Sequence, residues 1–348
     1  MRIGYSCWGF LGPGITDTPD GGRSHRRVLI DGLLARGHQI VFLQANRDHV
    51  EAGLDLTASY AWEQGLPEID VLMLEWRWPI PGRNTTACGQ PGHTCDLHRQ
   101  HELLGHYTHR LRLPTVLWDK DRHLPPDDTL RNQGNVAVCE AALYPSPGAA
   151  SLLFPVADHA LDGADASALA ALHRELPLVY IGNQYDRDAA FDRYFAPAAA
   201  QHEHLVAGKW TRTERWPHIR FAGRIAFPEV DNLYTRALAT VLLLPDRYAA
   251  VGQMTQRLFE AVLAGCLPLT PDTIEGAARF TPPGLHVSSG AEATRKIDQL
   301  RQIAGTARHV DLIAECMRRL DTFRLSRQLT TLDRLLTEPA RLQEIAAP

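Results

Sequence analysis

The segment of residues 240–270 limits the fold of this chain more than any other. Residues 240–245 are a β-branched and aliphatic run that ends in proline, which is typical of a buried strand. Residues 252–265 have apolar side chains on one helical face and end in glycine, and residues 267–270 are apolar again. The apolar face comprises Leu258, Phe259, Val262 and Leu263. The order strand, loop, helix, strand predicts a parallel βαβ crossover.

The same alternation fills the rest of the chain and predicts an α/β fold. We expect strands at residues 2–8, 38–43, 71–76, 115–119 and 136–139, and then at 178–183, 204–207, 219–222, 240–244, 267–270 and 286–288. Helices are expected at 24–36, near 48–64 and 96–110, and in a long amphipathic stretch at 311–336. Two doubly wound, Rossmann-like domains follow from this pattern. We place them at 1–163 and 164–320, with a helical segment at 321–348.

Length and composition are those of an ordinary globular protein. A chain of 348 residues exceeds the usual size of a single core. The net charge of −4 gives no basic field for non-specific binding of nucleic acid. No apolar run approaches the ~20 residues that span a bilayer, and the N-terminus shows no signal-peptide pattern, so we expect a cytoplasmic protein. The six cysteines are spread along the chain and are expected to be reduced thiols.

Several polar residues around the crossover are candidates for a phosphate and ribose site. A helix that starts near Gly252 would direct unpaired N–H groups and a positive dipole at a phosphate. Thr255 could cap that helix, and Arg257 would add charge. Glu260 could accept two hydrogen bonds from a ribose diol, or it could be an exposed residue paired with Arg257.

In the N-terminal half, polar residues follow the predicted strands at their carboxyl ends. The loop 9–22, Glu75, Arg77, Asp119 and Asp121 are expected at one crevice, because the ends of parallel strands meet at one edge of a sheet. Asp119 and Asp121 could instead be caps or ion-pair partners of neighbouring basic residues.

Three segments resemble the GT-B glycosyltransferases, which have two facing Rossmann-like domains. Residues 20–25, Asp-Gly-Gly-Arg-Ser-His, precede a helix that ends in Gly37-His38, similar to the glycine loop and the following turn of that family. Residues 181–188 resemble the start of its second domain, and residues 252–269 resemble its donor-binding helix. Many retaining members have Glu-x7-Glu in that helix, but here the first position is Gly252, so only Glu260 matches.

The resemblance implies transfer of a sugar from a nucleotide diphosphate sugar, UDP by frequency, to a small molecule, a saccharide or a modified nucleic-acid base. It implies no required cofactor and no metal. The implied donor-binding residues are Gly21, Gly22, Asn183, Arg187, Arg224, Gly252, Met254, Thr255, Arg257 and Glu260. An inverting enzyme needs a base on the acceptor, and the candidates are Asp119, Asp121 and His25, with Glu75 also near the crevice.

Other interpretations stay open at this stage. A nucleotide-sugar epimerase would share the fold, whereas a nucleotide-binding oxidoreductase would need a compact GxGxxG that the loop 9–22 lacks. A non-catalytic sugar-nucleotide binder is a further alternative. Residues 88–101 contain two cysteines and three histidines, which could bind zinc, but their spacing fits no standard finger. We expect a flexible acceptor-binding loop there and no metal site.

Overall fold

The chain forms two compact units, each with its own parallel sheet. The computed structural model describes residues 1–14, 22–82 and 84–337. The first unit contains Met1–Gly12, Gly22–Pro155 and the segment that begins at Leu325, and the second contains Val156–Arg324. The chain therefore passes from one unit to the other at Pro155/Val156 and returns at Arg324/Leu325, a few residues from the domain limits expected at 163 and 320.

The sheet of the first unit has seven parallel strands in the order β3-β2-β1-β4-β5-β6-β7. They are β1 (Arg2–Ser6), β2 (Gln39–Phe42), β3 (Ala61–Trp62), β4 (Val71–Glu75), β5 (Thr115–Asp119), β6 (Val136–Glu140) and β7 (Ala150–Ser151). Ile3 of β1 lies between Ile40 and Val71 in the sheet. The strand order reverses between β1 and β4, so the loops after these two strands diverge at that point.

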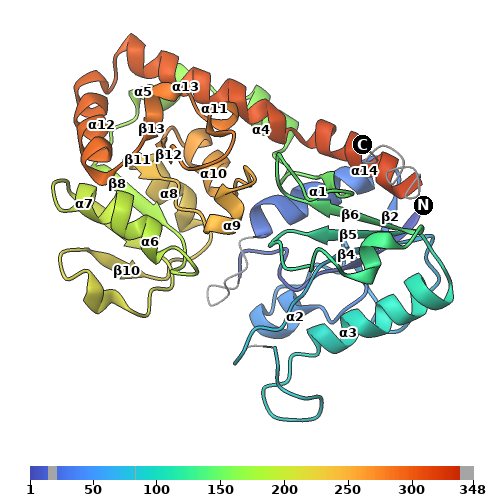
Figure 1. The fold of residues 1–348 in the computed structure, drawn as a ribbon. Coiled ribbons are helices and arrows are strands. Elements are labelled where there is room, and N and C mark those ends of the chain that lie inside the picture. The colour runs from blue at the N-terminus through green and yellow to red at the C-terminus, as the bar shows by residue number, and fades with distance from the viewer. Residues whose placement is uncertain (15–21, 83, 338–348) are drawn as a thin grey trace. The chain divides into compact units, whose positions relative to one another are not determined.

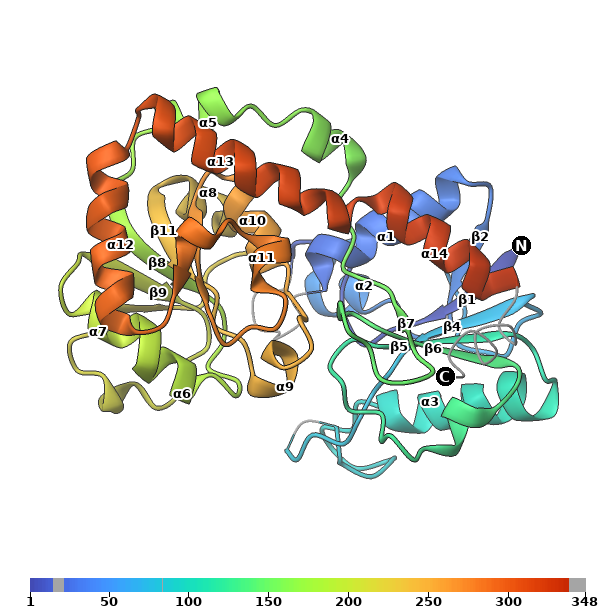
Figure 2. The ribbon, with the colours of Figure 1, turned by 45° about the horizontal axis from the view of Figure 1, so that its top comes forward.

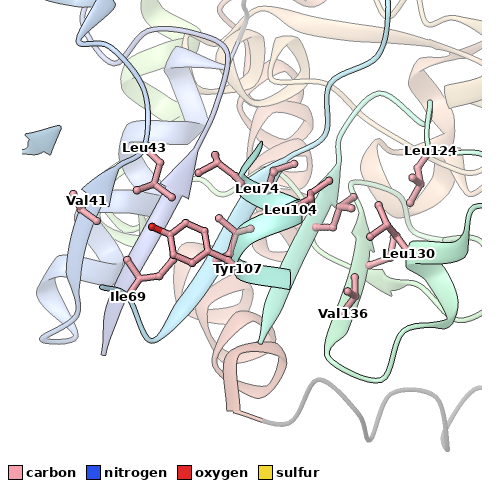
Figure 3. Close-up of a cluster of buried hydrophobic side chains, with 13 residues drawn as sticks. Val41, Leu43, Ile69, Leu74, Leu104, Tyr107, Leu124, Leu130 and Val136 are labelled. Carbon is pink, nitrogen blue, oxygen red and sulfur yellow. The ribbon is translucent and has the colours of Figure 1, made fainter. Parts of the chain in front are cut away.

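Helices cover both faces of this sheet (Figures 1 and 2). The helices are α1 (Arg23–Ala35), α2 (Arg47–Ala52), α3 (Asp96–Leu103), its π-helical continuation η1 (Leu104–Arg110), the 3₁₀ turn η2 (Thr129–Asn132) and α14 (Leu325–Thr337). The pair α1 and α14 lies on one face and α3 on the other. On the α3 face, Leu104 and Tyr107 pack on Leu74 and its neighbours, as Figure 3 shows.

The last helix belongs to the first unit although it is distant in sequence. A Cβ on Gly32 of α1 would lie 2.9 Å from a Leu329 methyl group, so the absence of a side chain lets α1 and α14 approach closely. The Gln328 side chain also accepts a hydrogen bond from the Leu153 amide at 2.9 Å. Burial of the apolar face of α14 thus closes the first unit.

The sheet of the second unit has six parallel strands in the order β10-β9-β8-β11-β12-β13. They are β8 (Leu176–Ile181), β9 (His204–Ala207), β10 (Phe221–Gly223), β11 (Ala237–Val241), β12 (Leu267–Pro271) and β13 (His286–Val287). Its helices are α4 (Asp158–Asp162), α5 (Ala166–Ala171), α6 (Asp188–Ala190), η3 (Phe191–Phe195), α7 (Ala196–Ala199), η4 (Thr213–Arg215), α8 (Glu229–Thr235), α9 (Asp246–Ala249), α10 (Arg257–Leu263), α11 (Ala277–Phe280), η5 (Pro283–Leu285), α12 (Gly290–Ile303), α13 (Ala307–Arg319) and η6 (Leu320–Phe323).

The core of the second unit lies where helices α8 and α10 pack on the sheet. Leu233, Tyr234 and Ala261 from these helices form one buried cluster with Val179 and Ile181 of β8. β8 is buried because strands flank it on both sides and helices cover its faces, which explains its continuous apolar sequence.

The predicted α/β fold class with two Rossmann-like sheets is confirmed. Each predicted strand has a counterpart, and the sequence pattern missed the two-residue strands β3 and β7. The helix expected near 48–64 was mostly wrong, because α2 ends at Ala52 and the next residue, Gly53, is left-handed with φ 65°. The stretch 311–336 is two helices, because Arg324 is extended at the point where the chain returns to the first unit. None of the helices in the described ranges has the length and hydropathy that crossing a bilayer requires.

Candidate functional site

The second unit has a switch point at β8, the strand from which the chain builds the sheet in both directions. Strands β9 and β10 lie on one side of β8, and β11 lies on the other. Ligands of doubly wound folds bind outside the carboxyl ends of the strands where the order reverses. Here those ends lead into residues 182–187 after β8 and residues 242–256 after β11.

Glycines bring the backbones of β8 and β9 close together at this edge. Gly208 has φ +131°, and a Cβ there would lie 2.2 Å from the Gly182 carbonyl oxygen. A Cβ on Gly182 would lie 2.5 Å from Arg257 Nε. The indole N–H of Trp210 donates to the Gly182 oxygen at 2.8 Å, and the Asn183 side chain accepts from the Lys209 amide at 2.8 Å. A side chain on Gly208 would push these strand ends apart, and one on Gly182 would displace the Arg257 guanidinium.

Arg257 is the cation at this edge. Its Nε donates to the Ile181 carbonyl at 2.6 Å, and its Nη1 donates to Thr255 Oγ1 at 3.3 Å. Burial alone would lower the pKa of Arg257, but Tyr180, Tyr234 and Glu260 raise it, so the guanidinium stays charged. Glu260 follows in the first turn of α10 and is half-buried.

Arg187 holds the two loops of the switch point together. Its buried side chain donates to the Leu243 carbonyl at 3.1 Å, to the Asn183 carbonyl at 3.2 Å and to the Tyr185 carbonyl at 2.6 Å. Burial lowers the pKa of this arginine. These contacts favour a role in shaping the site, whereas Arg224 is exposed beyond the end of β10.

The helix expected to start near Gly252 begins later, which corrects that prediction. α10 starts at Arg257, while Gly252 is left-handed with φ 61° and the Gln253 amide donates to the Tyr248 carbonyl at 3.0 Å. Residues 252–256 therefore form a loop in which Met254 and Thr255 are buried. The helix dipole of so short a helix is weaker than expected, and glycine and arginine define the site instead.

The first unit has a cavity at its own switch point. It measures about 270 Å³ and is lined by residues that follow β1, β2 and β4 and by the start of α3. Among the lining residues are Cys7, Trp8, Gln44, Arg47, Arg77 and Cys95. This is where the switch-point rule places a ligand.

Glu75 is the centre of a buried charge network beside this cavity. Arg26 binds both of its oxygens at 2.8 Å, Lys120 Nζ lies 2.5 Å from Oε2, and the Tyr5 hydroxyl donates at 2.7 Å. Burial would raise the pKa of Glu75, but Arg26 and Lys120 hold it well below its usual range. A permanently ionised, fully bonded carboxylate is a poor general base, so Glu75 is structural.

Arg77 joins this network to the cavity. Its guanidinium lies 3.6 Å from Glu75, and its side chain is 12% exposed. Its Nε and Nη2 are buried without a hydrogen-bond partner among the described residues. The Gln100 side chain of α3 donates to the Arg77 carbonyl and accepts from its amide, which fixes the backbone. Arg77 therefore brings a positive charge, paired with Glu75, into the wall of the cavity.

The three predicted bases lie in different environments. Asp119 is buried at the end of β5, and its two oxygens accept from the amides of His123 and Leu124 at 3.0 and 2.8 Å. Burial raises the pKa of Asp119. His25 is buried and stacked on Phe154 at 4.1 Å. Asp121 is half-buried in the loop after β5.

The glycine loop before α1 is described only in part. Gly22 precedes α1, and its carbonyl accepts from the Arg26 amide at 2.7 Å. Gly21 lies outside the described residues, and its implied role stays a prediction.

Sequence reasoning missed the Arg26–Glu75 pair. Arg26 occupies a position that continues the apolar spacing of Leu29, Ile30 and Leu33 in α1, and Glu75 ends an apolar strand. Two opposite charges at core positions were the available signal, because buried charges are paired.

Comparison with known proteins agrees with this arrangement. Residues 187–325 match the family model described as "Glycosyl transferase-like". No curated protein sequence matches the chain. The match lies almost entirely in the second unit, so the chain contains a glycosyl transferase-like domain within a two-sheet α/β fold. The resemblance inferred from sequence is confirmed at that level.

Solved structures share the fold over nearly the whole chain. T4 phage BGT in complex with UDP-glucose has a TM-score of 0.64 and 11% identity, over 97% of this chain and 100% of that one. AviGT4, a glycosyltransferase involved in avilamycin A biosynthesis, has a TM-score of 0.57 and 14% identity over 96% and 98%. Anabaena Alr3699/HepE in complex with UDP-glucose has a TM-score of 0.58 and 11% identity, over 97% of this chain and 99% of that one. These names include no epimerase and no oxidoreductase.

Proposed function

We propose that the second unit binds a uridine diphosphate sugar and that the protein transfers the sugar to an acceptor held by the first unit. The main support comes from the site at the ends of β8 and β9 and the start of α10. There Gly182, Gly208 and Arg257 surround the switch point of the glycosyl transferase-like domain. T4 phage BGT and Anabaena Alr3699/HepE, which share the fold, were both crystallised with UDP-glucose.

In the proposed donor complex, Arg257 neutralises the diphosphate and Glu260 binds the ribose hydroxyls. A charged guanidinium suits phosphate because it donates in a fixed fork. Developing negative charge on the departing diphosphate is then stabilised by a permanent cation. Catalysis would not require a divalent metal. T4 phage BGT was also crystallised with UDP and Mn²⁺, so turnover should be compared with and without added Mn²⁺, and we expect no change.

We assign the acceptor to the cavity of the first unit. Its volume of about 270 Å³ suits a small molecule or a single sugar or base unit rather than an extended polymer. The positive charge of Arg77 in the cavity wall favours an acceptor that carries a carbonyl, phosphate or carboxylate group. The DNA-modifying enzyme β-glucosyltransferase has a TM-score of 0.66 to this chain at 12% identity, so a nucleic-acid base is among the acceptors to test.

Asp121 is the proposed base, if the reaction inverts the anomeric centre. Asp119 and Glu75 use their oxygens in buried hydrogen bonds, and His25 is stacked inside the unit. Asp121 is half-buried on the loop after β5, which leaves it accessible to an acceptor at this edge of the sheet.

Thermal unfolding with UDP, UDP-glucose, GDP and NAD tests the donor class. A ligand at 100 times its Kd stabilises the folded state by about 2.7 kcal/mol. We expect UDP and UDP-glucose to raise the Tm and NAD to leave it unchanged. Stabilisation by NAD alone would end the proposal. Release of UDP from UDP-glucose that rises only when acceptors are added would separate transfer from epimerisation.

A further inference from the structure

The loop between β4 and α3 gathers sulfur and nitrogen ligand atoms at one point. The ligand atoms of Cys88, His93 and Cys95 all lie within 4.8 Å of one another. His98, on the first turns of α3, has its Nδ1 3.6 Å from Cys95 Sγ. The four residues have the spacing Cys-x4-His-x-Cys-x2-His. The sequence alone did not show that these side chains converge.

The distances suit tetrahedral coordination of a small cation. Bonds of roughly 2.3 Å to sulfur and 2.1 Å to nitrogen in a tetrahedron place neighbouring ligand atoms roughly 3.4–3.8 Å apart. The Cys95–His98 distance is already in this range. The ligand atoms of Cys88 and His93 lie within 4.8 Å of each other and of Cys95, so these three residues need at most a small contraction to reach it. His98 is outside this group of three and joins it through Cys95, so its ring must also move toward Cys88 and His93 when a metal binds.

His93 has the orientation of a metal ligand. Its Nδ1 lies 3.0 Å from the Thr86 carbonyl oxygen, which can only accept, so Nδ1 carries the proton. Nε2 then presents a lone pair, and no hydrogen-bond partner for this buried atom lies among the residues that the structure describes. Metal-binding histidines commonly donate their second ring N–H to a backbone carbonyl in this way.

The backbone of the loop is bent to bring the ligands together. Gly89 and Gly92, between Cys88 and His93, are left-handed with φ 81° and 79°. Cys95 is left-handed as well, with φ 64°, and it directly precedes α3. A non-glycine residue in this conformation is strained, and such strain persists where surrounding interactions fix it.

We propose that Cys88, His93, Cys95 and His98 bind one Zn²⁺ in a structural site. Two thiolates and two imidazoles are ligands that zinc prefers over Mg²⁺ or Ca²⁺. Four protein ligands leave no open position for a substrate, which indicates a structural role. Binding releases the two thiol protons, so the thiolates offset the charge of the cation.

The zinc site would fix one wall of the cavity in the first unit. Cys95 and His98 line that cavity together with Arg77. Residues 76–82 and 84–95 form neither helix nor strand, and loops of this length need another source of order. A metal at its end would order this loop and anchor it to α3. The inference does not depend on the identity of the donor or of the acceptor.

Metal analysis of the full chain tests the site. We expect the protein, purified under reducing conditions without chelators, to contain one zinc per chain. The Cys88→Ser/Cys95→Ser double variant should lose it. His101→Ala removes another exposed histidine of α3 and should keep the zinc, as the matched control.

Cobalt provides a readout on the wild-type chain that does not depend on the folding of any variant. Co²⁺ added to the metal-depleted full chain should give thiolate-to-metal charge-transfer and tetrahedral d–d absorption that saturates at one equivalent, and Zn²⁺ should displace it. Absence of these bands in the reduced chain would overturn the proposal. A double variant with the full zinc content, or a Cys88–Cys95 disulfide in the purified chain, would overturn it as well.

Discussion

The switch points of the two units share a topology, but charged side chains line one and backbone groups line the other. In the first unit, charged side chains fill the edge: Glu75 is surrounded by Arg26 and Lys120. In the second unit, backbone fills it: Gly182 and Gly208 bring strand ends into contact, and Arg187 and Arg257 donate to carbonyl oxygens. The difference suits the proposed division of labour. A diphosphate needs close approach to backbone and cations, whereas varied acceptors need a cavity with adjustable polar groups.

The largest effect should come from breaking the charge network of the first unit. Glu75→Gln leaves Arg26 and Lys120 without their counter-charge in a buried position, which should cost about 3–5 kcal/mol of unfolding free energy. Chemical denaturation measures it. Glu63→Gln, which removes an exposed partner of Arg2, should change stability by less than about 1 kcal/mol.

The pH dependence sharpens the same prediction. Because the folded-state pKa of Glu75 is depressed below its ordinary 4.5, its stabilisation is complete above that value and is lost as pH falls toward the folded-state pKa. The wild-type protein should therefore lose more stability than Glu75→Gln when acidified below about pH 5. Parallel losses in the two proteins would contradict the assigned ionisation.

Substitutions of Asp121 and Asp119, near the end of β5, distinguish a catalytic role from a structural one. Asp121→Asn should lower kcat about 100-fold or more if the residue is the base, with the Tm unchanged. Asp119→Asn places an amide group against the N–H of His123 or Leu124 and should lose about 1–3 kcal/mol of stability. Steady-state kinetics and thermal unfolding of both variants measure the two effects. The reverse pattern would exchange their roles.

One methyl group added at Gly208 should lower both the stability of the second unit and its affinity for UDP. Gly208→Ala forces a Cβ against the Gly182 carbonyl in a backbone conformation that alanine rarely adopts. We expect about 1–3 kcal/mol of destabilisation and a clear loss of UDP binding by calorimetry. Gly284→Ala has open space around its Cβ and no positive φ, so it should bind UDP like the wild type.

The smallest predicted effect concerns the ribose contact. Glu260→Ala should weaken UDP about tenfold, or about 1.4 kcal/mol, without lowering the Tm. Glu203→Ala changes an exposed glutamate of the same unit and serves as the control. Equal affinities of the two variants would remove Glu260 from the donor site.

Local sequence patterns were enough to predict the element order and the α/β class, because strand and helix periods are local properties of the chain. They also predicted that glycines and acidic residues follow the carboxyl ends of the strands. Where they failed, the cause was long-range. α10 begins at Arg257 only because the preceding loop bonds back to Tyr248, and α14 separates from α13 because it packs on α1.

Only the folded structure shows which candidate residues already use their polar atoms in hydrogen bonds within the protein. Arg187, Asp119 and Glu75 matched sequence expectations for a site, yet their polar atoms are bonded to groups far away or buried in their own loop. The sequence showed that residues 88–101 could bind zinc, but only the structure shows that Cys88, His93 and Cys95 converge. Hydrogen bonding and metal coordination depend on positions in space to within tenths of an ångström, and only the folded chain sets those positions.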